Sequence, residues 1–213
     1  MRPDEVLDTL QRAGFEAWYV GGCVRDTLLG RPIHDWDVTT SALPEQVLAL
    51  FPRTVPTGLQ HGTVTVLSDS GPVEVTTYRA DGDYHDGRHP DGVRFVRSLR
   101  EDTARRDFTV NAMAMDQRGN IRDFYGGRAD LAAGILRCVG APERRFREDA
   151  LRMLRACRFA AQLGFAIEPE TWAALLRCAP LCKQLSRERI TEEVTKTIRS
   201  PSPQWAAAMI RCG

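Results

Sequence analysis

The first 140 residues alternate between helical and strand-like patterns of hydrophobic positions. Apolar side chains recur at helical spacing from Pro3 to Ala13, and Gly14 follows as a stop signal. A short apolar strand at residues 17–20 comes next, and a helix opening with proline is expected at residues 44–51. Further strands are expected at residues 35–39, 63–67, 72–78, 112–115 and 121–124. The pattern predicts a mixed α/β (α+β) fold with helices packed on a sheet.

The pattern changes in two later parts of the chain. Residues 80–101 lack periodicity and carry three glycines between Asp81 and Gly92, which predicts a long loop. Beyond Pro142 only helical patterns follow, and they cover residues 148–163, 169–176 and 186–198. We therefore expect a mixed-sheet domain at residues 1–140 and an all-α domain at residues 141–213.

Composition places the chain among ordinary globular proteins. It has 213 residues, 43% hydrophobic and 27% charged. It has neither a run of about 18 apolar residues nor the apolar core of a signal peptide after Met1. Six cysteines are scattered through periodic segments, which is typical of reduced thiols. We expect a cytoplasmic protein with no membrane partner.

The net charge of +1 conceals an asymmetry along the chain. Residues 144–213 contain 13 Lys and Arg against 7 Asp and Glu, whereas residues 1–143 contain 16 against 21. A basic helical half suits phosphate-bearing partners such as nucleic acid. A solvated helical face would give the same count.

The pair Asp35 and Asp37 is the first candidate for chemistry. Residues two apart on a strand point the same way, so the two carboxylates project together while Trp36 turns to the other face. Carboxylate oxygens, completed by water and substrate phosphates, are ligands that Mg²⁺ prefers. An Asp-x-Asp alone is a weak signal, because turn and cap aspartates often produce it.

A double glycine strengthens this interpretation. Gly21 and Gly22 follow a strand and precede a predicted helix at residues 24–29, so backbone N–H groups there can approach a phosphate. Arg25 lies in the first turn of that helix, where the helix dipole does not favour a cation, and a triphosphate explains it better. Together with Asp35 and Asp37, these residues predict nucleotidyl transfer.

Glu74 is a third candidate carboxylate, in the predicted strand at residues 72–78. If it points inward from a neighbouring strand, it completes a metal-binding triad of catalytic carboxylates with Asp35 and Asp37. If it faces solvent, it is an ordinary glutamate of an amphipathic strand.

Six blocks of sequence resemble those of the class II tRNA nucleotidyltransferases, the family of the CCA-adding enzymes, with bacterial poly(A) polymerase as a near relative. The first two are Gly-Gly-Cys-Val-Arg-Asp at 21–26 and His-Asp-Trp-Asp-Val-Thr-Thr at 34–40. The others, which follow in the order expected of the family, are at 105–114, 123–131, 148–159 and 188–193. The resemblance therefore spans nearly the whole chain.

The resemblance implies a nucleotidyltransferase palm followed by an all-α neck, and a role for each matching residue. In the palm, Asp35 and Asp37 would bind metal. Gly22, Arg25 and Arg106 would contact nucleotide phosphates, with Asp107 and Asn111 near the ribose. The glycines at 126–127, with Asp130, resemble a hinge between head and neck. The loop at 80–102, with Tyr84, Arg88, His89 and Asp91, resembles the family's flexible loop, which is tied to addition of the terminal A.

In the neck, Asp149 and Arg152 match the family's pair of residues that reads the incoming base. Arg155 and Arg158 continue the row of arginines that begins at Arg152. Spacing of three residues also predicts that Asp149, Arg152 and Arg155 cluster toward one side of a helix, with Leu151, Leu154 and Cys157 toward the core. A carboxylate beside a guanidinium can bind the edge of cytosine or adenine. A surface ion pair is the simpler alternative.

The resemblance implies a Mg²⁺-dependent enzyme that adds C and A to the 3′ end of tRNA from CTP and ATP by a two-metal mechanism, releasing pyrophosphate. No obligate protein partner is inferred. Family members continue past the neck, so we expect the chain to be a truncated piece or a minimal natural form. A poly(A) polymerase, an A-adding specialist and a non-catalytic RNA-binding fragment remain alternatives.

Overall fold

The computed structural model describes residues 2–81 and 93–210, which form two compact units. The first unit consists of the described parts of Met1–Gly82 and Gly92–Arg106, together with Asn111–Tyr125. The second consists of Asp107–Val110 and the described part of Gly126–Gly213. The contacts thus divide the chain at residues 125–126, whereas the functional boundary near residue 140 stays a prediction.

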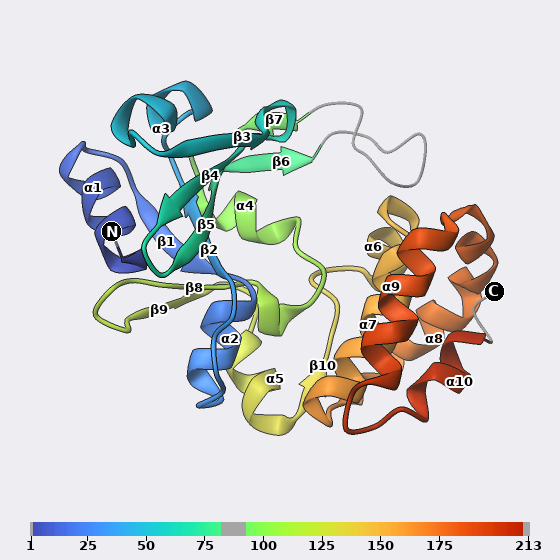
Figure 1. Cartoon of the computed structure of the whole chain (residues 1–213). Coiled ribbons are helices and arrows are strands. Elements are labelled where there is room, and N and C mark those ends of the chain that lie inside the picture. The colour runs from blue at the N-terminus through green and yellow to red at the C-terminus, as the bar shows by residue number, and fades with distance from the viewer. Residues whose placement is uncertain (1, 82–92, 211–213) are drawn as a thin grey trace. The chain divides into compact units, whose positions relative to one another are not determined.

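A seven-stranded mixed sheet forms the first unit (Figure 1). Its spatial order is β3-β4-β5-β2-β1-β8-β9. Only β2 and β5 run parallel, and the other neighbours are antiparallel. The strands are β1 (Ala17–Val20), β2 (Trp36–Thr40), β3 (Thr54–Gly58), β4 (Thr63–Ser68), β5 (Gly71–Thr77), β8 (Met113–Met115) and β9 (Ile121–Asp123). The predicted mixed sheet is confirmed.

Helices of the first unit bury the apolar faces that the sequence predicts. The helix α1 buries Val6, Leu7 and Leu10, and lies beside α3 against the sheet (Figure 1). The hydroxyl of Tyr19 donates a hydrogen bond of 2.7 Å to Asp4, which joins α1 to β1. The helical elements are α1 (Pro3–Arg12), α2 (Gly22–Leu28), α3 (Pro44–Leu50), η1 (Leu59–His61) and α4 (Leu99–Ala104).

Two features of the first unit were not predicted. The edge strand β3 contains Pro56, which an edge position tolerates because one side of an edge strand forms no ladder. The segment predicted as a loop at residues 80–101 begins and ends in regular structure. Strand β6 (Arg79–Asp81) pairs with β7 (Val93–Phe95), and α4 begins at Leu99. The flexible-loop residues Tyr84, Arg88, His89 and Asp91 lie outside the described residues.

The second unit is helical, as predicted, apart from a two-stranded parallel ribbon of β10 and β11. Its elements are α5 (Gly127–Ala133), β10 (Ile135–Leu136), α6 (Pro142–Glu148), α7 (Leu151–Leu163), β11 (Ala166–Ile167), α8 (Pro169–Cys178), η3 (Ala179–Gln184), α9 (Arg187–Ile198) and α10 (Trp205–Ile210). The short helix η2 (Thr109–Asn111) contains the boundary between two segments: its first two residues belong to the second unit and Asn111 belongs to the first. The predicted helix at 148–163 is interrupted, because Asp149 has an extended backbone (φ −145°, ψ 108°) between α6 and α7.

Helix α7 supplies much of the second unit's core. Leu154 and Cys157 are buried, as expected, while Leu151 is only partly buried. Phe159 packs edge-to-face on Phe108 with ring centroids 5.9 Å apart. No helix within residues 2–81 and 93–210 is long and apolar enough to span a membrane.

Candidate active site

The turn after β1 brings a cation and a carboxylate close to the backbone. Gly21 has φ +78°, and a Cβ at this residue would lie 3.1 Å from Nη1 of Arg106 and 3.3 Å from Oδ2 of Asp37. Only glycine allows this combination of backbone angle and close approach. Arg106, predicted to contact phosphate, and Asp37, predicted to bind metal, therefore lie at the same turn.

The carboxylates Asp37 and Glu74 lie on neighbouring parallel strands at paired positions of β2 and β5. Burial raises the pKa of Asp37, with Arg106 acting against it and Asp35 adding to it. Desolvation, followed by Asp37 and Asp35, also raises the pKa of Glu74. Nearby acids thus make Asp37 and Glu74 harder to ionise.

The position of each carboxylate bears on metal binding. Asp35 lies just before β2 and is exposed, Asp37 is partly buried, and Glu74 is exposed on its strand. Within the described ranges, no three His, Cys, Asp or Glu side chains are grouped closely enough to hold a metal ion by themselves. Coupled carboxylates such as Asp35 and Asp37 do fit a hard divalent ion that takes its remaining ligands from water and substrate phosphates.

Arg25 is anchored at the base of the glycine turn. It is 8% exposed, and its Nη1 donates a hydrogen bond of 2.8 Å to the side-chain oxygen of Asn111, which is 5% exposed. Its Nε and Nη2 bind the neighbouring Asp26 at 3.0 and 2.8 Å. The structure thus joins two predicted nucleotide-binding residues, Arg25 and Asn111, that are 86 positions apart.

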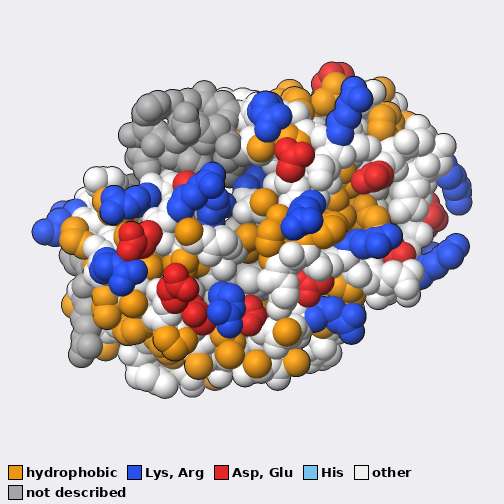
Figure 2. All heavy atoms as spheres, turned by 180° about the vertical axis from the view of Figure 1, so that it is seen from behind, with side chains coloured by type: hydrophobic (Ala, Val, Ile, Leu, Met, Phe, Trp, Pro, Cys, Tyr) orange, Lys and Arg blue, Asp and Glu red, His pale blue; other side chains and the backbone are white. Residues whose placement is uncertain are grey.

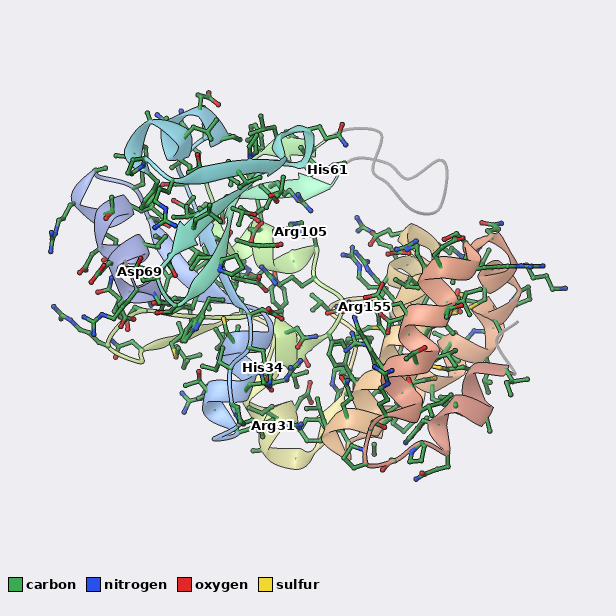
Figure 3. The ribbon with its side chains drawn as sticks, in the orientation of Figure 1. Arg31, His34, His61, Asp69, Arg105 and Arg155 are labelled. Atoms are coloured by element: carbon green, nitrogen blue, oxygen red, sulfur yellow. The ribbon has the colours of Figure 1, made fainter. Side chains whose placement is uncertain are left out.

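Asp102 was missed by the sequence reasoning. It is fully buried in α4 and accepts hydrogen bonds from the Thr39 hydroxyl at 3.0 Å and from Nε of Arg105 at 3.1 Å (Arg105 is labelled in Figure 3). Burial opposes ionisation of Asp102, but the neighbouring Arg105 and Arg106 hold its pKa below the ordinary value. Arg105 and Arg106 follow Asp102 by three and four residues, which is the spacing at which side chains on a helix meet. This spacing is the sequence signal that could have identified Asp102.

In the second unit, Asp107 binds Arg155, which is labelled in Figure 3. Nε and Nη2 of Arg155 donate to one carboxylate oxygen at 2.8 and 2.6 Å, and the other oxygen accepts from the backbone of Phe108 at 2.8 Å. These contacts join Arg155 of α7 to the segment that leads into η2. Asp107 was predicted beside the ribose, and this role stays a prediction.

The predicted base-reading residues pair differently from the expectation. The backbone N–H of Arg152 donates to the carbonyl of Asp149 at 3.0 Å, but the side chains of the two residues bind different partners. Asp149 accepts from Nη2 of Arg189 at 3.0 and 3.2 Å, while Arg152 donates to Glu148 at 2.7 Å. Asp149 does not share a helix face with Arg152 and Arg155, because it lies in the break between α6 and α7.

Arg158 and Asp130 also have defined partners. Nε of Arg158 donates to Glu193 of α9 at 2.5 Å, and both side chains are at most 10% exposed. Asp130, in the predicted hinge, accepts from the Thr109 hydroxyl at 2.6 Å and from Nε of Arg137 at 3.2 Å. Gly126 before it has φ +78°, in the left-handed region.

A mixed sheet with a glycine turn, an anchored arginine and coupled carboxylates defines the class of nucleotidyltransferase head domains. The family model described as poly A polymerase head domain matches residues 17–137. A second model, described as the probable RNA and SrmB-binding site of polymerase A, matches residues 164–213. The chain belongs to the poly(A) polymerase and CCA-adding enzyme family, as its sequence blocks indicated.

Relatives with known names are similar over most of this chain. The CCA-adding enzyme of Geobacillus stearothermophilus is 53% identical over 92% of this chain and 48% of its own length. That of Lactiplantibacillus plantarum is 52% identical over 93% of this chain and 49% of its own length. The chain therefore spans about half the length of the curated relatives that it matches.

Solved structures agree with these sequence matches. A crystal structure of the Bacillus stearothermophilus CCA-adding enzyme in complex with CTP has a TM-score of 0.89 and 47% identity, covering 99% of this chain and 52% of that one. The Thermotoga maritima CCA-adding enzyme complexed with tRNA, at 24% identity, has a TM-score of 0.78 over 98% of this chain and 49% of that one, which shows a shared fold.

Proposed function

We propose that this chain is the catalytic portion of a tRNA nucleotidyltransferase that adds C and A to the 3′ end of tRNA. CTP and ATP are the nucleotide substrates, and pyrophosphate is released. The observation that carries the proposal is the joint approach of Asp37 and Arg106 to Gly21, within a head domain whose relatives include a CCA-adding enzyme solved with CTP. We also propose the cytoplasm as its compartment.

We assign the catalytic head to residues 1–140 and the helical neck to residues 141–213. In the head, the terminal ribose hydroxyl of the RNA attacks the α-phosphorus of the nucleotide. A new P–O bond forms, the bond from the α-phosphorus to the bridging oxygen breaks as pyrophosphate leaves, and the hydroxyl proton passes to solvent. Gly22, Arg25 and Arg106 bind and orient the triphosphate, which positions the α-phosphorus for attack.

Mg²⁺ is the cofactor that we assign to Asp35 and Asp37; when bound, it would supply positive charge that stabilises the reacting phosphates and the leaving pyrophosphate. Glu74, at the position paired with Asp37, adds a further carboxylate beside it, which favours a cation there. Asp107 and Asn111 are assigned to the ribose. Since Asn111 binds Arg25, this amide also fixes the arginine that faces the triphosphate.

We assign base reading to the second unit. Asp149 offers acceptor oxygens that Arg189 holds in place, and Arg152 offers donors that Glu148 holds. The ion pairs of Arg155 and Arg158 support this assignment by joining α7 to Asp107 and to α9. Donors and acceptors fixed in this way discriminate between bases by leaving the wrong base unpaired.

The test is incorporation of labelled CTP and ATP by the purified chain with Mg²⁺. Its RNA substrates are tRNA transcripts that end at the discriminator base or after CC. We expect C and then A to be added, and the double change Asp35→Ala with Asp37→Ala to lower the rate at least about 1,000-fold. Asp8→Ala, on the exposed side of α1, is the control. Undiminished activity of the double variant would remove both aspartates from the mechanism.

A second candidate, addition of A alone, is favoured by the description of the matching head-domain family as a poly A polymerase. The same assay separates the two activities, because a poly(A) polymerase or an A-adding specialist would leave CTP unused on every transcript. Incorporation of neither nucleotide, with the RNA still bound, would favour a non-catalytic RNA-binding fragment.

A further inference from the structure

A hollow of about 410 Å³ opens on the first unit, within the size range of small-molecule sites. Three arginines, two aromatic side chains and one acid contribute to its lining: Arg97, Arg100, Arg122, Trp18, Phe124 and Glu16. They come from β1 and the residue before it, from α4 and the segment just before it, and from β9 and the residue after it. None of them has a role in the nucleotidyl transfer proposed above.

The hollow has an excess of positive charge. Within residues 2–81 and 93–210, Arg97, Arg100 and Arg122 form no ion pair with a carboxylate, unlike Arg25 and Arg105. The lining acid, Glu16, accepts a hydrogen bond of 3.1 Å from Tyr78. Charged side chains of both signs are interspersed over the molecular face in Figure 2. With three arginines and one glutamate in its lining, the hollow carries more positive than negative charge.

Aromatic rings lie beside two of these guanidinium groups. Cζ of Arg122 lies 5.8 Å from the ring centroid of Trp18, and Cζ of Arg100 lies 5.9 Å from that of Phe124. These distances are close to the outer limit of about 6 Å for a cation–π contact. Phe124 is 38% exposed, so part of its ring is open to a ligand.

The lining is held by the fold. Trp18 packs on a buried cluster that includes Leu99, and the hydroxyl of Tyr125 donates a hydrogen bond of 2.7 Å to the carbonyl of Arg100. Both aromatic walls and the start of α4 are therefore fixed relative to one another. Long arginine side chains at the rim can then adjust to a bound anion.

The hollow is separate from the catalytic carboxylates. Trp18 pairs with Thr39, which lies two residues beyond Asp37 on β2, so the hollow lies toward the opposite end of that strand. Thr39 is bound to the buried Asp102 of α4. The side chain of Asp102 thus lies between the two regions.

We propose that this hollow is a second binding site, one that takes a nucleoside phosphate. The base stacks on Phe124, and the phosphate is bound by Arg97, Arg100 and Arg122. Stacking on an aromatic ring beside unpaired arginines is how proteins bind single-stranded nucleic acid without reading its sequence. The nucleoside phosphate belongs either to an RNA strand or to a free nucleotide. The site does not depend on the transfer reaction proposed above.

The test measures binding by the full chain of a fluorescein-labelled single-stranded RNA about ten nucleotides long, and of adenosine 5′-monophosphate. We expect Arg100→Ala with Arg122→Ala to weaken RNA binding about tenfold and to reduce the slope of log K against log salt concentration by about 1.4. Phe124→Ala should weaken it about tenfold through lost stacking, with an unchanged salt slope. Arg118→Ala, in the turn between β8 and β9, is the matched control and should leave binding unchanged.

The two possible sources of the nucleoside phosphate are distinguished by which of the two ligands the variants bind more weakly. Weaker binding of the RNA identifies an RNA strand, and weaker binding of the monophosphate alone identifies a free nucleotide. Unchanged binding of both ligands, or an equal loss with Arg118→Ala, overturns the proposal. CTP incorporation by the unaltered chain is measured in parallel. If it is absent while the variants still weaken binding, the transfer activity fails and this site stands.

Discussion

Asp37 and Glu74 lie side by side at paired register positions of the parallel strands β2 and β5. Each has a pKa raised by desolvation and by neighbouring acids. A protein without a bound cation therefore loses stability by keeping these carboxyls ionised. The same carboxylates that lower the stability of the cation-free protein increase its affinity for a cation.

The first prediction concerns pH. Because the folded pKa of Asp37 lies above its ordinary value of 3.8, the folded state binds more protons in the window between the two values, and stability falls as pH rises through it. Asp37→Asn should thus raise the free energy of unfolding at pH 7 by on the order of 1 kcal/mol. The gain should vanish below about pH 3, where both states are protonated. Urea unfolding across this range, without divalent ions, measures it.

Asp116 provides a control of opposite sign. Slight desolvation acts against it, but hydrogen bonds from Asn120 and from the backbone of Arg118 hold its pKa below the ordinary value. Its contribution is present above the ordinary pKa and is lost as pH falls through the folded pKa. Asp116→Asn should therefore lower stability at pH 7. If Asp37→Asn also lowers it, the electrostatic account of the site is wrong.

The second prediction concerns the glycine turn. Gly21→Ala places a Cβ 3.1 Å from Arg106 and 3.3 Å from Asp37 and strains a backbone with φ +78°. We expect a loss of about 1–3 kcal/mol in unfolding free energy and at least about a hundredfold fall in nucleotide incorporation. Gly30→Ala, also at positive φ (+64°) but with no atom within 4 Å, is the matched control. It should lose stability and keep its activity.

The third prediction concerns the pair Asp107 and Arg155. The carboxylate is 8% exposed and the guanidinium 33%, so the cost of breaking the pair lies between those of surface and buried pairs. Either single change to Ala should cost about 2 kcal/mol of unfolding free energy. The double variant should cost less than the sum of the single changes, with a coupling of about 1 kcal/mol. Additive losses in this double-mutant cycle would show that the contact contributes nothing.

The fourth prediction concerns base selection. Asp149→Ala removes the acceptor that Arg189 holds, so kcat/KM for CTP and ATP should fall about 10- to 100-fold, with a smaller change for UTP and GTP. Single-nucleotide incorporation with each of the four triphosphates measures the ratio. Glu170→Ala, exposed at the start of α8, should leave all four values unchanged. An equal fall for every nucleotide would assign Asp149 a structural role alone.

Local pattern was sufficient to predict most elements of the fold. The strand at Ala17–Val20 was predicted with its observed bounds, because its apolar run ends at the glycines. Strand β3 could not be predicted, since Pro56 argues against a strand unless its edge position is known. The break at Asp149 was also missed, because the residues around it continue a helical period in sequence.

The partners of the predicted site residues were less accessible to sequence. The Arg25–Asn111 hydrogen bond joins two blocks separated by 86 positions. The pairing of Asp149 with Arg189 joins the break before α7 to α9, 40 positions further along the chain. Residue type and local spacing identify such groups. Their partners depend on which distant segments the fold brings together, and local hydrophobic periodicity does not contain that information.

The position of β1 in the sheet has a consequence for how the protein is made. This strand lies between β2 and β8, so one edge of residues 17–20 can pair only after β8, which ends at Met115, has been synthesised. During translation one edge of β1 stays unpaired until Met115 has left the ribosome, and pairing across such a separation in sequence is slow. The nascent chain therefore needs protection from aggregation until β8 emerges.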